Sequence, residues 1–269
     1  MSDAELGSRI EGIRQLGGVV RAMTGIAGAR ARTARAQIAA VEGYADSLGD
    51  ALAQAMAGIA GQAAPAPGRP AVVVFCAEQG FVGGFSERVL EAVETDRAGS
   101  DLFLVGSRGA AIAAGRGLVP VWSAAMPSRS ASLPKFADQV LAAVFAQADL
   151  RPVSVVHTVW GRGQGRVQRL ALFPLVSERD APEQSAPLAN LPAAELATSL
   201  SLDRLHALMT RAALQAFVAE NEARMASMAA ASRQIDEELG VLEALARRMR
   251  QEAITSEIIE IASGAMVGR

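Results

Sequence analysis

One stretch decides the fold: residues 225–249 read MASMAAASRQIDEELGVLEALARRM. Its apolar and small residues recur in alternating steps of three and four. They are Met225, Met228, Ser232, Ile235, Leu239, Leu242, Ala246 and Met249. A repeat of 3.5 residues keeps one stripe of a helix against a partner helix as the two wind together. The pattern therefore predicts a coiled coil near the C-terminus.

A second stretch near the N-terminus has nearly the same period. Its apolar positions are Ile38, Val41, Ala45, Leu48, Leu52 and Ile59. We expect this helix to run from about residue 3 to residue 61, because the three prolines of residues 63–70 then end it. The C-terminal helix, taken from about Asp203 to Ser263, would be roughly 90 Å long at 1.5 Å per residue. Since the two helices flank everything else, the simplest assembly pairs them antiparallel.

The middle of the chain alternates between strand and helix patterns. Short apolar runs predict strands at 71–76, 101–105, 119–122, 152–160 and 167–173, with helices at 86–95, after the 106–109 turn, and at 135–147. Strands alternating with helices predict a parallel sheet with helical cover, and the last two strands read as an antiparallel hairpin. The predicted fold class is α/β plus coiled coil, with a central Rossmann-like α/β domain inserted into a long antiparallel two-helix coiled coil.

These patterns divide the chain into four segments. We expect an N-terminal coiled-coil helix at 1–62, the α/β domain at 70–176, a proline-containing connector at 177–202 and a C-terminal coiled-coil helix at 203–269.

Composition excludes several classes of protein. The formal net charge of −2 argues against a basic nucleic-acid binder. Cys76 is the only cysteine, so an internal disulfide is impossible, and with two histidines a zinc site is not expected. No apolar run approaches the roughly 20 residues of a membrane span, and the N-terminus lacks a signal-peptide pattern. We expect a cytoplasmic chain, soluble by itself, without cofactor or metal.

The sequence offers little for catalysis. Residues 78–85, EQGFVGGF, follow a predicted strand and precede a helix, where a glycine loop can hold phosphate. The loop lacks the Lys-Ser/Thr of a P-loop and the GxGxxG spacing, so a tight structural turn is the competing interpretation. His157 and His206 have no acidic neighbour in sequence, and no nucleophile–base arrangement emerges.

Arginine is concentrated on the two helical segments. No acidic residue lies between Glu11 and Glu42, whereas five arginines do: Arg14, Arg21, Arg30, Arg32 and Arg35. Residues 247–251, RRMRQ, form a second group. The planar guanidinium suits carboxylates, so these groups could meet acidic surfaces of a surrounding partner.

The C-terminal residues resemble the signature of a known family, the gamma subunit of F-type ATP synthases. The matching residues are Glu220, Arg224-Met225, Met228, Arg250-Gln251, Ile254-Thr255, Glu257-Ile258, Glu260-Ile261 and Gly264-Ala265. Weaker matches are Arg9-Ile10, Arg21-Ala22-Met23 and the glycine turn with Gly80, Gly83, Gly84 and Phe85. Where the family reads Ile-Thr-Lys-Ala-Met this chain has Val19-Val20-Arg21-Ala22-Met23, a difference that indicates a divergent branch.

The resemblance implies a central rotor shaft that couples ion flow through a membrane ring to ATP synthesis or hydrolysis in a catalytic head. It implies as partners the alpha and beta subunits of the head, the epsilon subunit and the membrane c-ring, at the cytoplasmic face of the bacterial plasma membrane. By the family's pattern the rotor–stator contacts would be Arg21, Met23, Arg250, Gln251 and Thr255. None would be catalytic.

Two other classes of protein remain open. A coiled-coil scaffold carrying an α/β module would form a symmetric homodimer through the same heptad pattern. A Rossmann-type enzyme would bind a nucleotide through the loop from Gly80 to Gly84.

Overall fold

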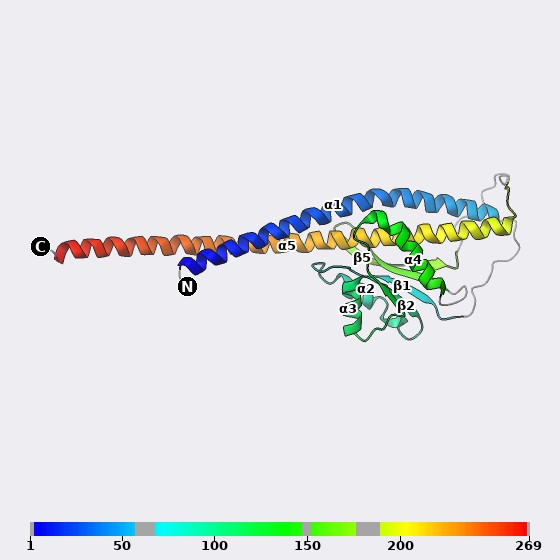
Figure 1. Cartoon of the computed structure of the whole chain (residues 1–269), viewed down its shortest axis with the longest axis horizontal. Coiled ribbons are helices and arrows are strands. Elements are labelled where there is room, and N and C mark those ends of the chain that lie inside the picture. The colour runs from blue at the N-terminus through cyan, green and yellow to red at the C-terminus, as the bar shows by residue number, and fades with distance from the viewer. Residues whose placement is uncertain (1–2, 57–67, 147–151, 176–188, 268–269) are drawn as a thin grey trace. The chain divides into compact units, whose positions relative to one another are not determined.

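The computed structural model describes residues 3–56, 68–146, 152–175 and 189–267, with side chains up to Ile261. It contains two compact units, one made of Met1–Ile26 with Met225–Arg269 and the other of Ala27–Arg224. We call them the terminal unit and the α/β unit. Two long helices, α1 (Asp3–Met56) and α5 (Ala193–Val267), run through both units (Figure 1).

The terminal unit is an antiparallel helix pair. Leu6 and Ile10 of α1 pack with Leu242 and Ala246 of α5. Further along α1, Val20 packs with residues earlier on α5, Met228 and Ile235. Residue numbers therefore rise on one helix as they fall on the other. The predicted antiparallel coiled coil is confirmed, and on α5 its seam lies at the heptad positions read from the sequence. The N-terminal repeat from Ile38 to Leu52 instead packs within the α/β unit.

The α/β unit contains a five-stranded sheet. Its strands are β1 (Ala71–Phe75), β2 (Asp101–Val105), β3 (Trp122–Ala124), β4 (Val153–Gly161) and β5 (Gln164–Phe173), in the order β3-β2-β1-β4-β5. The first four strands are mutually parallel and β5 is antiparallel to β4. The hairpin turn consists of Arg162 and Gly163, both with positive φ, which matches the twist of the flanking strands.

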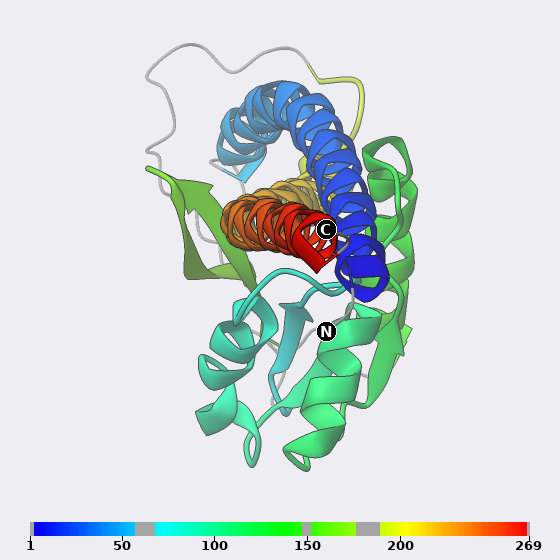
Figure 2. The same cartoon turned by 90° about the vertical axis from the view of Figure 1, so that its left-hand side faces the viewer.

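Alternate residues of the central strands face two different layers of helices. Helices α2 (Phe85–Glu91) and α3 (Ser107–Gly115) cover the face that bears Val72, Val74, Leu102 and Leu104. The opposite face packs against α4 (Leu133–Ala146) and against the parts of α1 and α5 that belong to this unit. In both views α2 and α3 lie on the side of the sheet away from α5 (Figures 1 and 2). Two 3₁₀ turns, Glu94–Asp96 and Ser130–Ser132, complete the described elements.

Several predicted boundaries were wrong; the helix predicted at 86–95, for example, ends at Glu91. Helix α5 begins at Ala193, ten residues before the predicted start at Asp203, because Pro192 is followed directly by strong helix formers and its carbonyl accepts the first helical bond from Leu196. The third strand is not 119–122 but β3, because Pro120 has no N–H for a ladder and Val119 is 85% exposed. The predicted continuation of the first helix to residue 61, including Ile59, lies outside the described residues.

Candidate functional site

The two predicted contact residues on α1 differ in exposure. The Arg21 side chain is exposed, whereas Met23 is half-buried and packs in the seam with Val20 and Met228. Arg21 is therefore available to a partner chain. Met23 also belongs to the core of the coiled coil.

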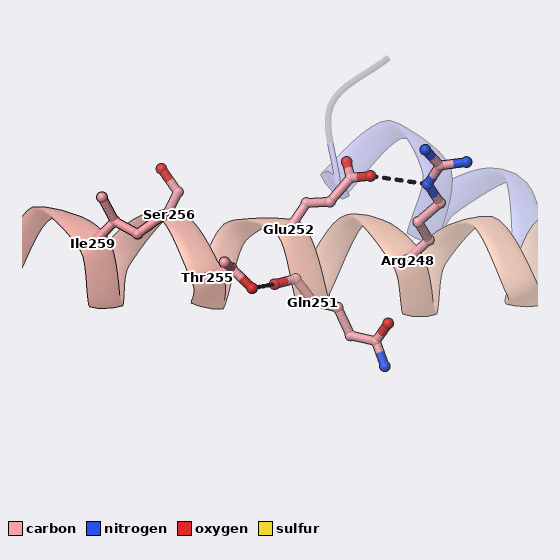
Figure 3. Close-up of a pocket in the computed structure, with 6 residues that line it drawn as sticks. All are labelled: Arg248, Gln251, Glu252, Thr255, Ser256 and Ile259. Carbon is pink, nitrogen blue, oxygen red and sulfur yellow. Dashed lines mark hydrogen bonds and ion pairs between the residues drawn. The ribbon is translucent and has the colours of Figure 1, made fainter.

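The three predicted contact residues on α5 are all exposed. The Thr255 hydroxyl donates to the backbone carbonyl of Gln251 at 2.8 Å, a bond that keeps it on its own helix. Figure 3 shows this bond and shows the Gln251 amide extending away from the helix. Every described side chain from Arg250 to Ile261 is exposed, so a partner could contact this end of α5 from any side.

A shallow hollow lies on the same part of α5. It is lined by Arg248, Gln251, Glu252, Thr255, Ser256 and Ile259 (Figure 3). The guanidinium of Arg248 donates to the Glu252 carboxylate at 2.8 Å, one helical turn away. All the lining residues come from a single helix and cannot enclose a small molecule. The surface therefore suits a macromolecular partner.

Apolar side chains are exposed on both helices of the terminal unit. On α5, Ile254, Ile258 and Ile261 follow a spacing of four and three and are 57%, 61% and 67% exposed. On α1, Leu16, Val19 and Ile26 are each more than half exposed. Large apolar residues that share a helical face without an intramolecular partner mark a protein interaction surface.

The arginines divide into paired and unpaired groups. Arg14 contacts Glu243 at 2.6 Å and Arg35 contacts Glu222 at 2.5 Å, so these two are neutralised within the chain. Arg21 and Arg250 form no ion pair with any residue of the described ranges. We therefore restrict the expectation of a contact with a partner protein to the arginines without an ion pair, Arg21 and Arg250.

The glycine loop after β1 is closed by the chain's own carboxylates. One Glu78 oxygen accepts bonds from the Ser107 and Met126 N–H groups at 2.9 and 2.8 Å, and the other accepts from the Ser107 hydroxyl at 2.8 Å. Ser107 begins α3, so a carboxylate already occupies the helix N-terminus to which a phosphate would bind. The structural-turn interpretation of residues 78–85 is the one that the geometry supports.

The neighbouring glycines are explained by close packing. A Cβ on Gly109 would lie 2.0 Å from the Cβ of Cys76, and Gly106 has a φ of +110°. Each position excludes a side chain, so glycine is required there by the close approach of the start of α3 to Cys76 and Ala77, directly after β1, and not by a ligand.

The buried titratable groups are structural. Burial lowers the pKa of His157 to about 4, and its Nε2 lies 2.9 Å from the Gln215 side-chain oxygen. Burial raises the pKa of the Cys76 thiol to about 12, which removes it as a nucleophile at neutral pH. His206 contacts Asp138 at 3.2 Å, an acidic partner that is remote in sequence. Across the described residues no three His, Cys, Asp or Glu side chains cluster as metal ligands would.

Glu220 and Arg224 belong to the family signature, but their partners could not be predicted from the sequence. They form an ion pair at 2.5 Å with both side chains almost completely buried, 6% and 5% exposed. Glu220 accepts from the backbone N–H groups of Glu78 and Gln79, and Arg224 donates to the carbonyls of Gln79 and Gly80. A signal was available, since charged residues that interrupt a buried helical face need partners.

The same loop presents an exposed aromatic ring. Phe81 has a φ of +60° and is 66% exposed. A bulky residue in the left-handed region is strained, so the surrounding contacts must hold it there.

None of the helices in the described part of the chain combines the length and apolarity of a membrane span.

The chain is similar to known proteins over nearly its whole length. The ATP synthase gamma chain of Frankia casuarinae is 28% identical over 285 aligned positions, which cover 96% of this chain and 94% of that one. The rotor of the Euglena gracilis mitochondrial ATP synthase superposes with a TM-score of 0.66 at 13% identity, covering 94% of this chain and 98% of that one. The central stalk and c-ring structure of Tetrahymena thermophila gives 0.56 at 16% identity, covering 80% and 99%. The family model described as ATP synthase matches residues 2–266, and the chain therefore belongs to the ATP synthase family.

Proposed function

We propose that this chain is the gamma subunit of a bacterial F-type ATP synthase, the central shaft that couples ion flow through a membrane ring to ATP synthesis or hydrolysis in a catalytic head. The observation that carries the proposal is the antiparallel pair in the terminal unit, combined with the fully exposed end of α5. A shaft must be stiff and must present side chains to a surrounding bearing. A paired helix supplies stiffness, and residues 250–261 supply the surface.

The resemblance to gamma subunits suggests a partner for each part of the chain. The alpha and beta subunits of the head would surround parts of the helices α1 and α5, with Arg21, Met23, Arg250, Gln251 and Thr255 as contacts. The α/β domain at 70–176 would contact the epsilon subunit and the membrane c-ring. The chain would then be held peripherally at the cytoplasmic face of the plasma membrane, with ATP chemistry on the partner subunits.

The coiled-coil homodimer is the weaker candidate. The heptad positions that would form its interface, such as Ile235 and Leu242, already pack against α1 of the same chain. A second copy would have to displace α1.

Purification of a tagged chain from its native host tests the function. We expect it to recover six large head subunits with one copy of this chain. Recovery of a homodimer without them would contradict the proposal.

Two double variants then test the contact residues on α5. Arg250→Ala with Gln251→Ala should reduce assembly or ATP-coupled turnover. The matched control is Arg14→Ala with Glu243→Ala, which removes an ion pair already satisfied within the chain and away from this surface and should leave both nearly unchanged. Equal effects of the two would refute the assigned contacts.

A further inference from the structure

A group of charged side chains joins α5 to the loop after β1, and the group lies wholly within the α/β unit. Its members are Glu78, Glu220 and Arg224, with the backbone of Gln79 and Gly80. We call it the loop clamp. We propose that the loop clamp is the joint that transmits rotation between α5 and the α/β domain, an inference that rests on the proposed rotor function.

The first half of the clamp grips the loop from α5. The Glu220 carboxylate accepts from two successive N–H groups, those of Glu78 and Gln79, each at 3.2 Å. The Arg224 guanidinium donates to the next carbonyl, that of Gly80, at 3.3 Å, and to that of Gln79 at 3.5 Å. One turn of α5 therefore fixes both the donors and the acceptors of a three-residue backbone segment.

The second half of the clamp grips the rest of the domain from the loop. The Glu78 side chain points the other way and binds the first turn of α3 at Ser107 and the segment after β3 at Met126. A force on α5 is thus passed through two carboxylates and one short loop to α3 and to the segment that follows the edge strand. No apolar contact is needed in this chain of bonds.

The loop clamp fixes the register between α5 and the domain, which apolar packing alone fixes less well. The remaining contact between α5 and the sheet is mainly the packing of residues such as Met209, Ala213 and Phe217. Apolar burial is roughly proportional to area and has no preferred direction, so it resists separation better than it resists sliding or twisting. Hydrogen bonds to charged groups are short and directional, so they fix register.

Burial makes the clamp stronger than the other polar contacts of α5 with the domain. His206 and Asp138 are exposed by 33% and 68% at their side chains, and the Gln215–His157 contact joins two neutral groups. The Glu220 and Arg224 side chains are 6% and 5% exposed and lie where water does not screen them. Phe81, which has a positive φ and is 66% exposed, follows the clamped residues directly.

The test replaces the buried pair by apolar residues of similar size, Glu220→Leu with Arg224→Met. Such replacement preserves packing and is often neutral for stability, so it removes the clamp without unfolding the chain. The control is Glu222→Gln with Arg35→Gln, which removes a neighbouring pair between α5 and α1. If the apolar variant does not fold by circular dichroism, E220Q, which keeps the shape and loses the charge, takes its place with the same outcomes.

The first readout is amide hydrogen exchange of Glu78 and Gln79, whose N–H groups bind Glu220, in the isolated full-length chain. We expect exchange at least about tenfold faster in the clamp variant, because the bonds lost are to charged groups, and no change in the control. Unchanged exchange would overturn the clamp.

The second readout is coupling in the reconstituted complex, measured as ions pumped per ATP hydrolysed. We expect the ratio to fall by about half or more in the clamp variant while ATP hydrolysis continues, and to stay unchanged in the control. Faster exchange with an unchanged ratio would overturn the transmission role and leave a purely structural contact. Failure of the unaltered chain to assemble with head subunits would instead refute the proposed function, and the exchange measurement would still decide whether the clamp exists.

Discussion

Helix α5 has very different surroundings in the two units of the molecule. Every residue from Ala207 to Arg224, in the α/β unit, is buried or half-buried. From Met225 to Met249, in the terminal unit, the fully buried residues are confined to the seam: Met228, Ile235, Leu242 and Ala246. Beyond Met249 every described side chain is exposed. The comparison teaches that one continuous helix can serve as a domain core, as half of a coiled coil and as a free surface.

The polar contacts of the two units differ in the same way. The α/β unit holds a buried ion pair and a buried neutral histidine. In the terminal unit the interhelical pairs Arg9–Glu238 and Arg14–Glu243 have side chains at least 38% exposed. Buried polar groups fix a unique arrangement, whereas exposed pairs contribute little. The α/β unit should therefore be the more stable and the more specifically packed.

The largest expected loss of stability comes from replacing a buried leucine of α5 by alanine, once in each unit. Leu214→Ala in the α/β unit should lower the free energy of unfolding by about 4 kcal/mol, and Leu242→Ala in the terminal unit by about 2 kcal/mol. Leu214 is 1% exposed inside a rigid core, whereas the cavity left by Leu242 lies between two helices that can move together. Urea denaturation followed by circular dichroism measures both. Equal losses would show that the two surroundings pack alike.

The next effect is a pH dependence confined to the α/β unit. The pKa of His157 falls from its usual 6.5 to about 4 in the fold, so the unfolded chain takes up the proton first as pH falls. The stability that His157 contributes is complete above pH 6.5 and is lost between pH 6.5 and about 4, by about 3 kcal/mol at most. The difference between the stability–pH curves of the unaltered chain and His157→Gln isolates this residue. Parallel curves would refute the assignment.

Replacing a glycine by alanine should change the stability in opposite directions in the two units. Gly109→Ala should destabilise the α/β unit by about 2 kcal/mol, because the new methyl group would overlap Cys76. Gly25→Ala, on the α1 segment of the terminal unit, should stabilise by up to about 1 kcal/mol, because nothing lies within 4 Å and alanine favours the helix. Thermal unfolding of both variants provides the measurement. Destabilisation at Gly25 would mean that this face of α1 is already covered.

The smallest effect is expected at an exposed ion pair of the terminal unit. Arg14→Gln removes the contact with Glu243 and should change the free energy of unfolding by less than about 1 kcal/mol, with the difference shrinking as salt is added. Denaturation at low and high ionic strength measures it. A larger loss of stability that does not depend on salt would show that this ion pair behaves like a buried one.

Much of the fold could be predicted from local patterns. Strand β2 was predicted at its observed bounds, and the hairpin of β4 and β5 was read from two apolar runs around a glycine turn. Alternation of strands and helices correctly predicted a parallel sheet. The C-terminal heptads predicted a coiled coil, and the position of the two helices at the ends of the chain predicted their antiparallel pairing. Boundaries failed where a proline acts on its neighbours, at Pro120 and Pro192, because the effect depends on whether the adjacent N–H groups have partners.

The candidate site could be predicted only in part. A resemblance in sequence pointed to Arg250, Gln251 and Thr255, and the structure places all three on the exposed end of α5. Met23 was predicted as a contact and also lies in the helix seam. The pairing of Arg14 and Arg35 within the chain was not foreseen, since their carboxylates lie about two hundred residues away in sequence.

The sequence by itself determined the periodicities: which residues face a partner helix, which alternate across a sheet and where glycine or proline interrupts them. These properties depend on neighbours a few positions away, so a linear pattern contains them. Only the tertiary structure decided that Glu78 closes the N-terminus of α3 and that Glu220 and Arg224 grip the loop before Phe81. A hydrogen bond forms within about 3 Å, and which groups come that close is set by tertiary packing. Glu78 and Ser107 are 29 residues apart in sequence, and Glu220 and Arg224 lie more than 140 residues from the loop.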